Sequence, residues 1–76
     1  MSEPQRAVPW AVTGATGFIG RALCRALDDD GVPVRALVRG AGTSAPAGCE
    51  AVRGDLADPA ALRALVAGAG VVVHCA

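Results

Sequence analysis

Residues 13–20 read Thr-Gly-Ala-Thr-Gly-Phe-Ile-Gly, and this stretch decides the fold of the chain. The apolar run before it predicts a buried strand of a parallel sheet over 8–13, interrupted at its start by Pro9. After it, apolar residues recur at helical spacing and predict an amphipathic helix over 18–29. The residues of this apolar stripe are Ile19, Leu23, Ala26 and Leu27. A strand, a glycine-rich turn and a helix in this order form the context in which a glycine pattern predicts a phosphate-binding loop.

The three glycines of this loop are expected to have separate roles. Gly14 lets the chain leave the strand through a backbone conformation that a Cβ would forbid. Gly17 lets a diphosphate approach the backbone closely, and Gly20 lets the helix pack tightly on the strand. The first amides of the helix lack partners within it, and the helix dipole places partial positive charge there, so a diphosphate satisfies both. The alternative is an ordinary strand-to-helix turn that is rich in glycine.

Size and composition limit the chain to one small domain. Seventy-six residues, 53% of them hydrophobic, bury only about 60% of their unfolded surface. Seven arginines balance seven acidic residues, so no net charge recruits nucleic acid or an anionic membrane. The apolar stretches are far shorter than the ~20 residues of a membrane span, and the polar segment 1–7 lacks the apolar core of a secretion signal. We therefore expect a cytoplasmic protein with no nucleic-acid or membrane partner.

The cysteines, the single histidine and the acidic run do not form a recognisable metal or redox motif. Cys24, Cys49 and Cys75 are odd in number and lack C-x-x-C spacing, so reduced thiols are the simplest account, with Cys24 and Cys75 as small core residues. His74 has no second ligand at a suitable spacing and is expected to be structural. The acidic run 28–30 is expected to be a solvated corner, with a metal site as the alternative. No metal ligand is predicted.

The rest of the sequence alternates strands with one more helix. Strands are predicted over 33–38, 50–53 and 71–76, the last apolar throughout, as in a strand covered on both faces. The alternation implies right-handed parallel crossovers. The strand over 33–38 should place Leu37 on one face and alternate residues on the other. Those alternate residues are Val34, Ala36 and Val38.

Local signals mark the ends of the helices and one loop. Gly31 suits a left-handed cap after the first helix. The pair Asp58-Pro59 is an N-cap with a proline at the first helical position and opens a helix over 59–67, which a glycine at 68 or 70 should end. The segment 40–48 is small and turn-forming and is predicted to be a flexible loop. The second helix should direct three residues inward, Leu62, Leu65 and Val66.

The glycine spacing G-x-x-G-x-x-G, with the leading Thr13 and the Phe-Ile pair, resembles the short-chain dehydrogenase/reductase superfamily. The resemblance is to its extended and atypical branches, of the NAD-dependent epimerase/dehydratase type. It covers residues 8–76 and also rests on 34–39, 54–56 and 71–76. It implies an α/β fold, a Rossmann-like parallel sheet with helices on both faces, truncated to its first four strands in the order 3-2-1-4. We expect a partial NAD(P)-binding domain over 1–76, with a polar tail at 1–7.

Arg39 ends the second strand, where cofactors without a 2′-phosphate usually meet a carboxylate. An arginine can bind a 2′-phosphate through two hydrogen bonds, so NADP is favoured over NAD. A solvated loop residue is the alternative for Arg39, and Arg35 is a weaker candidate. The resemblance places Asp55 at the adenine pocket, with a turn cap as the alternative, and a small residue at position 76 beside the cofactor. The predicted cofactor-binding residues are Gly14, Ala15, Thr16, Gly17, Phe18, Ile19, Gly20, Arg39, Asp55, Leu56 and Ala76.

Thr13 and Thr16 are expected to support the loop through hydrogen bonds with the backbone. The chain contains no tyrosine and no lysine, whereas the resemblance implies a catalytic Tyr-x-x-x-Lys pair on a later helix, so no catalytic residue is predicted here. We interpret the chain as the NADP- or NAD-binding segment of an epimerase, dehydratase or reductase for a small-molecule substrate, with a homodimeric parent as one option. The alternatives are a non-catalytic NADP sensor or scaffold, or an inactive truncated product. By itself the chain should be inactive and poorly folded, because its last strand exposes an apolar edge.

Overall fold

The computed structural model describes residues 8–40 and 42–75. Its elements follow in the order β1 (Trp10–Thr13), α1 (Phe18–Asp29), β2 (Val34–Val38), β3 (Glu50–Arg53), α2 (Pro59–Val66) and β4 (Val71–His74). All six predicted elements are present. Two strands begin later than predicted, because Pro9 and Pro33 precede them and a proline has no amide hydrogen to donate to a sheet. The predicted polar tail lies outside the described residues.

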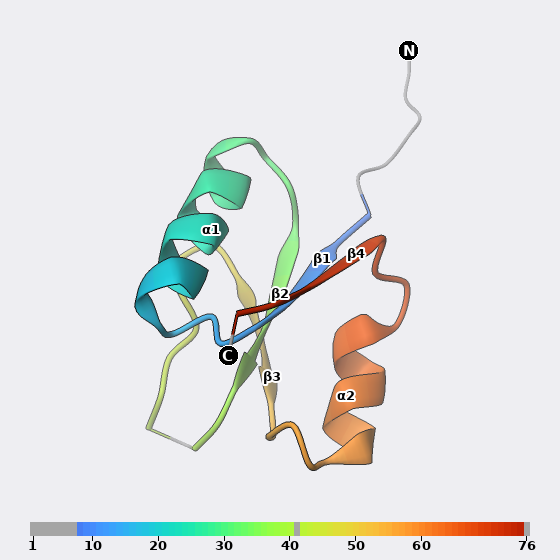
Figure 1. The fold of residues 1–76 in the computed structure, drawn as a ribbon. Coiled ribbons are helices and arrows are strands. Elements are labelled where there is room, and N and C mark those ends of the chain that lie inside the picture. Colours follow the sequence, from blue (N-terminus) through green and yellow to red (C-terminus); the bar gives the residue numbers. More distant parts are fainter. Residues whose placement is uncertain (1–7, 41, 76) are drawn as a thin grey trace.

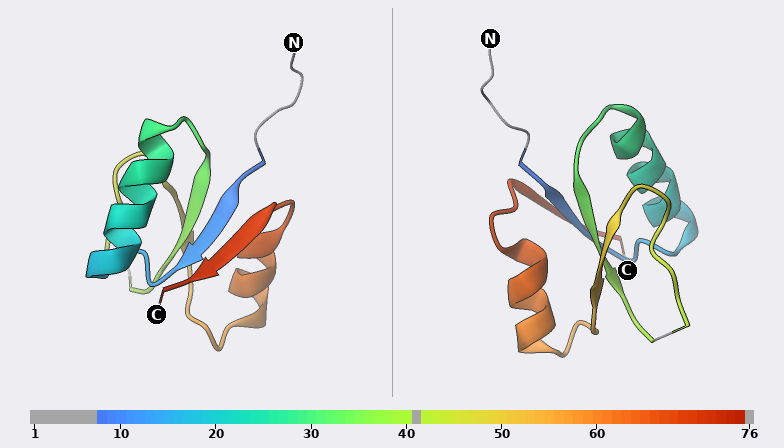
Figure 2. Two further views of the ribbon diagram at one scale, coloured as in Figure 1. Left: turned by 45° about the horizontal axis from the view of Figure 1, so that its top comes forward. Right: turned by 180° about the vertical axis from the view of Figure 1, so that it is seen from behind.

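The four strands form one parallel sheet in the order β3-β2-β1-β4 (Figure 1). Trp10 of β1 lies beside Val34 of β2 on one side and Val71 of β4 on the other. α1 covers one face of the sheet and α2 covers the opposite face (Figure 2). The predicted strand order and the predicted placement of helices on both faces are therefore confirmed.

Each face of the sheet carries its own apolar core. Val12, Val34 and Val38 pack against α1, whereas Ala11 and Leu37 pack against α2. Successive residues of a strand point to opposite faces, so the alternation predicted for β2 is confirmed. The sheet thus has two cores of small and branched side chains with a single layer of strands between them.

The first helix packs on the sheet through a different stripe from the one predicted. Leu27 is buried as expected, but Ile19 is 70% exposed and Ala26 is exposed as well. The buried residues of α1 are Gly20, Cys24 and Leu27, at positions i, i+4 and i+7. Gly20 faces the end of β1, and Ile19 lies one residue, or about 100°, around the helix from it, so Ile19 is turned away from the core.

α1 ends in a Schellman motif, as the position of Gly31 predicts. Gly31 has a φ of 75°. Its amide donates to the Asp28 carbonyl at 3.0 Å, and the Val32 amide donates to the Leu27 carbonyl at 2.9 Å. These two bonds satisfy carbonyls that the end of a helix leaves open. The acidic run 28–30 is exposed at this corner, as predicted.

α2 begins at the predicted cap. The Asp58 carboxylate accepts hydrogen bonds from the amides of Ala60 at 3.0 Å and Ala61 at 3.3 Å. The helix ends at Val66, and Gly68 follows with a φ of 71°. Leu65 is buried as predicted, but Val66 is 42% exposed, and Ala61 is buried in the inward position instead. Ala61 precedes Leu65 by four residues, so the two share one face of the helix.

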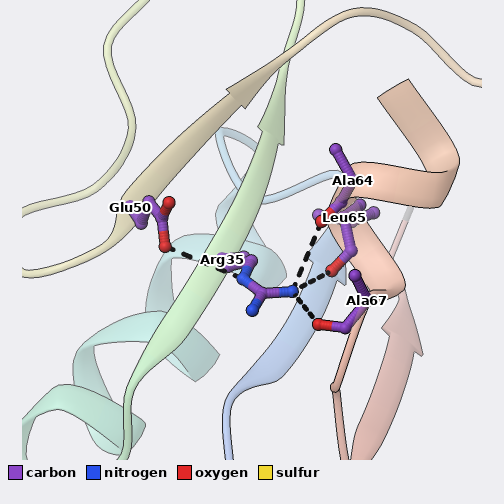
Figure 3. A network of polar contacts seen from close by, with 5 residues as sticks. All are labelled: Arg35, Glu50, Ala64, Leu65 and Ala67. Carbon is purple, nitrogen blue, oxygen red and sulfur yellow. Dashed lines mark hydrogen bonds and ion pairs between the residues drawn. The ribbon is translucent and has the colours of Figure 1, made fainter. Parts of the chain in front are cut away.

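The side chain of Arg35, on β2, forms hydrogen bonds with the carboxyl end of α2 (Figure 3). Its Nη1 donates to the carbonyl oxygens of Ala64 at 3.3 Å, Leu65 at 3.1 Å and Ala67. Its Nε lies 3.7 Å from a carboxylate oxygen of Glu50. A cation at this end of a helix is favourable because the dipole places partial negative charge there. These contacts engage the guanidinium in the fold, so Arg35 is no longer a candidate for binding a cofactor.

Replacing Arg35 with methionine should lower the free energy of unfolding by about 1.5–3 kcal/mol, because it removes charge-assisted bonds to three helix carbonyls, one of them in a partly buried contact. Glu50→Gln is the matched control. It breaks an ion pair with an exposed partner and should cost less than about 1 kcal/mol. Urea denaturation of both variants, made in the protein at its full encoded length, measures the difference. Equal losses would show that the ion pair, and not the cap on α2, stabilises this side of the sheet.

Candidate functional site: a cleft at the carboxyl edge of the sheet

A cleft of about 720 Å³ lies at the carboxyl ends of β1 and β2. This volume is in the range of small-molecule sites, and the carboxyl edge of a parallel sheet is where such folds bind ligands. The cleft brings together five of the predicted residues, Gly14, Thr16, Arg39, Asp55 and Leu56. They come from the glycine loop, the end of β2 and the turn after β3. Residues far apart in the sequence therefore meet at one edge of the sheet, and their contact with a cofactor stays a prediction.

Two glycines of the loop are required by the fold itself. Gly14 has a φ of 68°, which lets the chain turn at the end of β1. A Cβ on Gly20 would lie 2.1 Å from the Gly14 carbonyl oxygen and 2.7 Å from the Cα of Ala15. No side chain fits in that space, so α1 starts in direct contact with the turn. Both roles agree with those predicted from the spacing.

Gly17 is the exception, because none of the residues that the structure describes requires a glycine there. Its φ of −78° and ψ of 176° suit any residue. A Cβ would meet only the Gly14 carbonyl oxygen, at an ordinary distance of 3.5 Å. The missing side chain leaves the backbone of the loop bare on its solvent side, where a ligand can approach.

The first turn of α1 has no side-chain cap for its amides. Gly17, at the N-cap, offers no side-chain cap, and the first turn carries no acidic residue. Within residues 8–40 and 42–75, the amides of Phe18, Ile19 and Gly20 donate to no acceptor. Unpaired amides at the positive end of a helix dipole attract a phosphate group.

The side-chain supports of the loop differ from those predicted. The Thr13 hydroxyl is 2.5 Å from Nδ1 of His74 on the neighbouring strand, so it contacts a side chain and not the backbone. Thr16 takes part through its carbonyl, which accepts from Nε of Arg21 at 3.0 Å. The contact with Thr13 gives His74 the structural role expected of it. The sequence could not show this pair, because it depends on the register that sets Thr13 beside His74.

The predicted polar groups of the cleft sit at the ends of neighbouring strands. Arg39 is exposed, and no carboxylate of the described residues lies within ion-pair distance of it. One carboxylate oxygen of Asp55 accepts a hydrogen bond from the Ala57 amide at 2.8 Å. Asp55 therefore caps its turn, as the alternative interpretation proposed, while its side chain also lines the cleft. Leu56 beside it is 47% exposed.

Other predicted site residues lie outside the cleft lining. The Ala15 side chain is fully buried in the core against α1, so only its backbone can face a ligand. Phe18 and Ile19 are 91% and 70% exposed on the first turn of α1. Ala76 lies outside the described residues.

The prediction missed Thr43, which lines the cleft from the loop after β2. This loop contains no helix or strand among its described residues, as expected. Its start is nevertheless anchored, because Nη1 of Arg53 donates to the carbonyls of Gly40 at 3.0 Å and Thr43 at 2.8 Å. The small, turn-forming residues of this loop do not indicate that Arg53 binds it. The flexibility expected of the loop stays a prediction.

Two of the three thiols, those of Cys24 and Cys49, are not activated as nucleophiles. Cys24 is fully buried, and burial together with the neighbouring Cys49 thiol raises its pKa to about 12. Burial also raises the pKa of Cys49. A thiol reacts as the thiolate, so both groups are poor nucleophiles at neutral pH. The core position predicted for Cys24 is confirmed, and Cys75, which is partly buried, packs against the same core.

Within the described ranges, no group of three or more His, Cys, Asp or Glu side chains is placed to hold a metal ion. Neither α1 nor α2, the helices of the described part of the chain, has the length and apolar character needed to cross a membrane.

A Gly20→Ala substitution should destabilise the fold by about 1–3 kcal/mol, because the new methyl group would overlap the Gly14 carbonyl. Gly17→Ala is the control within the same loop and should change stability by less than about 0.5 kcal/mol, since a Cβ fits there. Thermal denaturation of the two variants, made in the protein at its full encoded length, gives the comparison. Similar losses in both would contradict the separate roles that the structure gives the two glycines.

Comparison with known proteins places this chain in a family. The profile of the NAD dependent epimerase/dehydratase family matches residues 10–76. The chain is similar to a ceramide reductase of Caulobacter vibrioides, with 48% identity over 69 residues, which are 87% of this chain and 22% of that protein. It is also similar to a 2-alkyl-3-oxoalkanoate reductase of Stenotrophomonas maltophilia, with 45% identity over 64 residues, 83% of this chain and 19% of that one.

A solved structure agrees with this assignment. It is that of a short-chain dehydrogenase/reductase superfamily protein of Agrobacterium tumefaciens with bound NAD, and it matches at a TM-score of 0.74 and 38% identity over 90% of this chain and 20% of that one. The chain thus spans about a fifth of the length of each of these relatives. The family profile covers all but the first nine residues, and the fold and the glycine loop agree with it, so this chain belongs to the NAD dependent epimerase/dehydratase family.

Proposed function

We propose that this chain is the dinucleotide-binding part of an NAD(P)-dependent oxidoreductase or epimerase/dehydratase, with NADP preferred to NAD. The observation that carries the proposal is the bare backbone at Gly17. The fold has room for a side chain at this position, yet its absence exposes a loop that leads into three amides without acceptors in the described chain. A diphosphate accounts for both features, because it needs close backbone approach and donors at a helix N-terminus.

In this proposal, different residues around the cleft would contact different parts of the dinucleotide. The backbone from Gly14 to Gly20 would hold the diphosphate. Asp55 and Leu56, in the turn after β3, would border the adenine, and Ala76 stays a predicted contact near the far end of β4. The bound nicotinamide supplies hydride transfer. The chain's own contribution is to bind and orient the cofactor, because the fold collects backbone donors and one guanidinium at a single edge of the sheet.

Arg39 supports the preference for NADP. It is exposed in the cleft wall and has no carboxylate partner among the described residues, so its guanidinium is available to an anionic ligand. A ribose without a 2′-phosphate is commonly bound by a carboxylate at this place, and β2 ends here in an arginine. The similar Agrobacterium tumefaciens protein holds NAD, so we propose NADP as a feature of this chain and not of the family.

The proposed substrate class and catalytic step follow from the family resemblance. The 76 residues include no tyrosine and no lysine, so the proton-transfer pair that the resemblance implies would come from outside them. A small molecule with a carbonyl or carbinol carbon is the proposed substrate class. The missing pair also keeps a non-catalytic NADP-binding protein as the second candidate. The cytoplasmic location and a homodimeric parent stay predictions.

Calorimetric titration of the protein at its full encoded length tests the proposal. The wild type should bind NADPH more tightly than NADH. Arg39→Ala should weaken NADPH binding by about 1.5–3 kcal/mol, roughly ten- to a hundred-fold, and leave NADH binding nearly unchanged, because only NADPH carries the 2′-phosphate.

The matched control is Arg25→Ala, which removes an exposed arginine of α1 that does not line the cleft. It should leave both affinities at the wild-type level. Equal wild-type affinities for the two cofactors would contradict the NADP preference, and a wild type that binds neither would contradict dinucleotide binding altogether.

A further inference from the structure

Arg53 lies beside the cleft, at the end of β3. It is the last residue of β3 and pairs in the sheet with Val38, the last residue of β2. The amide of Gly54 then donates to the Val38 carbonyl at 3.1 Å. Arg53 therefore sits next to the point where the chain passes into Arg39. Its side chain is exposed, and no carboxylate of the described residues lies within ion-pair distance of it.

The guanidinium of Arg53 is engaged with the backbone of the next loop. Its Nη1 donates to the carbonyls of Gly40 at 3.0 Å and Thr43 at 2.8 Å. The same Gly40 carbonyl also accepts from the Thr43 amide at 3.4 Å, a long and weak contact. Charge-assisted bonds are stronger than neutral ones. The two hydrogen bonds from Arg53 are therefore the main link between the backbone at Gly40 and the backbone at Thr43.

The bonds from Arg53 lie beside the wall of the cleft. Gly40 directly follows Arg39 and leaves the strand with a φ of 78°. Thr43 lines the cleft together with Arg39. The loop has no regular secondary structure in its described part, so side-chain contacts must hold its backbone against the entropy of an open chain. The glycine loop on the other side of the cleft has its own supports in Gly20 and in the contact of Arg21 with the Thr16 carbonyl.

We infer that Arg53 is a positioning residue for the 2′-phosphate end of the cleft. It holds Gly40 and Thr43 without touching the dinucleotide, and so it keeps Arg39 where a 2′-phosphate can be bound. The inference rests on the proposed function, whose NADP preference it assigns to two arginines instead of one. Because the diphosphate loop is supported separately, Arg53 affects the choice between NADPH and NADH and leaves the common part of the cofactor alone.

Three variants of the protein at its full encoded length test this role: Arg53→Ala, Arg53→Lys and the control Arg25→Ala. Arg53→Ala should weaken NADPH binding about tenfold and NADH binding less than about twofold. Arg53→Lys keeps a cation but loses the planar group, so its NADPH affinity should fall between those of the wild type and Arg53→Ala. All three should unfold in a single cooperative thermal transition, which checks that the fold is intact.

The rate of amide hydrogen exchange at Thr43 distinguishes a positioning role of Arg53 from a direct electrostatic effect of its charge on the cofactor. Arg53→Ala should speed this exchange in the free protein, and Arg39→Ala should not. A normal ratio of NADPH to NADH affinity in Arg53→Ala would overturn the inference, as would a changed ratio with unchanged exchange at Thr43.

These outcomes are distinct from failure of the proposed function. A wild type without NADPH preference would remove the proposed function's cofactor assignment and this inference together. A wild type that prefers NADPH and loses the preference in Arg39→Ala, but keeps it in Arg53→Ala, would overturn the inference alone.

Discussion

The direct contact between Gly20 and the Gly14 carbonyl is the constraint on which the rest of the structure depends. Any side chain at position 20 would overlap that oxygen, so α1 can start against the end of β1 only with a glycine there. This contact sets the rotation of the helix, which buries Cys24 and Leu27 and turns Ile19 outward. It also holds the first amides of α1 at the carboxyl edge of the sheet, beside the cleft. One packing requirement thus determines both a core face and a binding face.

The cleft is built from two supports that do not depend on each other. On one side, glycine packing fixes the loop 13–20. On the other, Arg53 holds the start of the loop after β2 through two carbonyls. Between them, the parallel register brings Arg39 and Asp55 to neighbouring strand ends. Under the proposed function, this division would give the diphosphate and the 2′-phosphate of the ligand separate binding regions.

The sequence correctly predicts the features that depend on contacts between residues close together in the chain. Caps such as Asp58-Pro59 and Gly31 mark helix ends through contacts within a few residues, and the strand order follows from the family resemblance. The errors concern groups whose surroundings come from distant segments. Ile19 and Val66 fit an apolar helical pattern, but helix rotation on the sheet leaves them exposed. The Arg53 anchor likewise required the register of β3 against β2 before it could be seen. Arg39 and Asp55 were predicted to lie just after strand ends, and both line the cleft; their contact with a cofactor stays a prediction.

The central claim is that the fold does not need a glycine at position 17 and the ligand does. The most direct measurement is calorimetric binding of NADPH and NADH to Gly17→Val, together with far-ultraviolet circular dichroism and thermal denaturation of the same protein. We predict that both cofactors lose measurable affinity while the spectrum and the melting temperature stay close to those of the wild type, because the side chain blocks only the approach to the backbone. Wild-type affinity in Gly17→Val would contradict the account and show that the loop is only a turn.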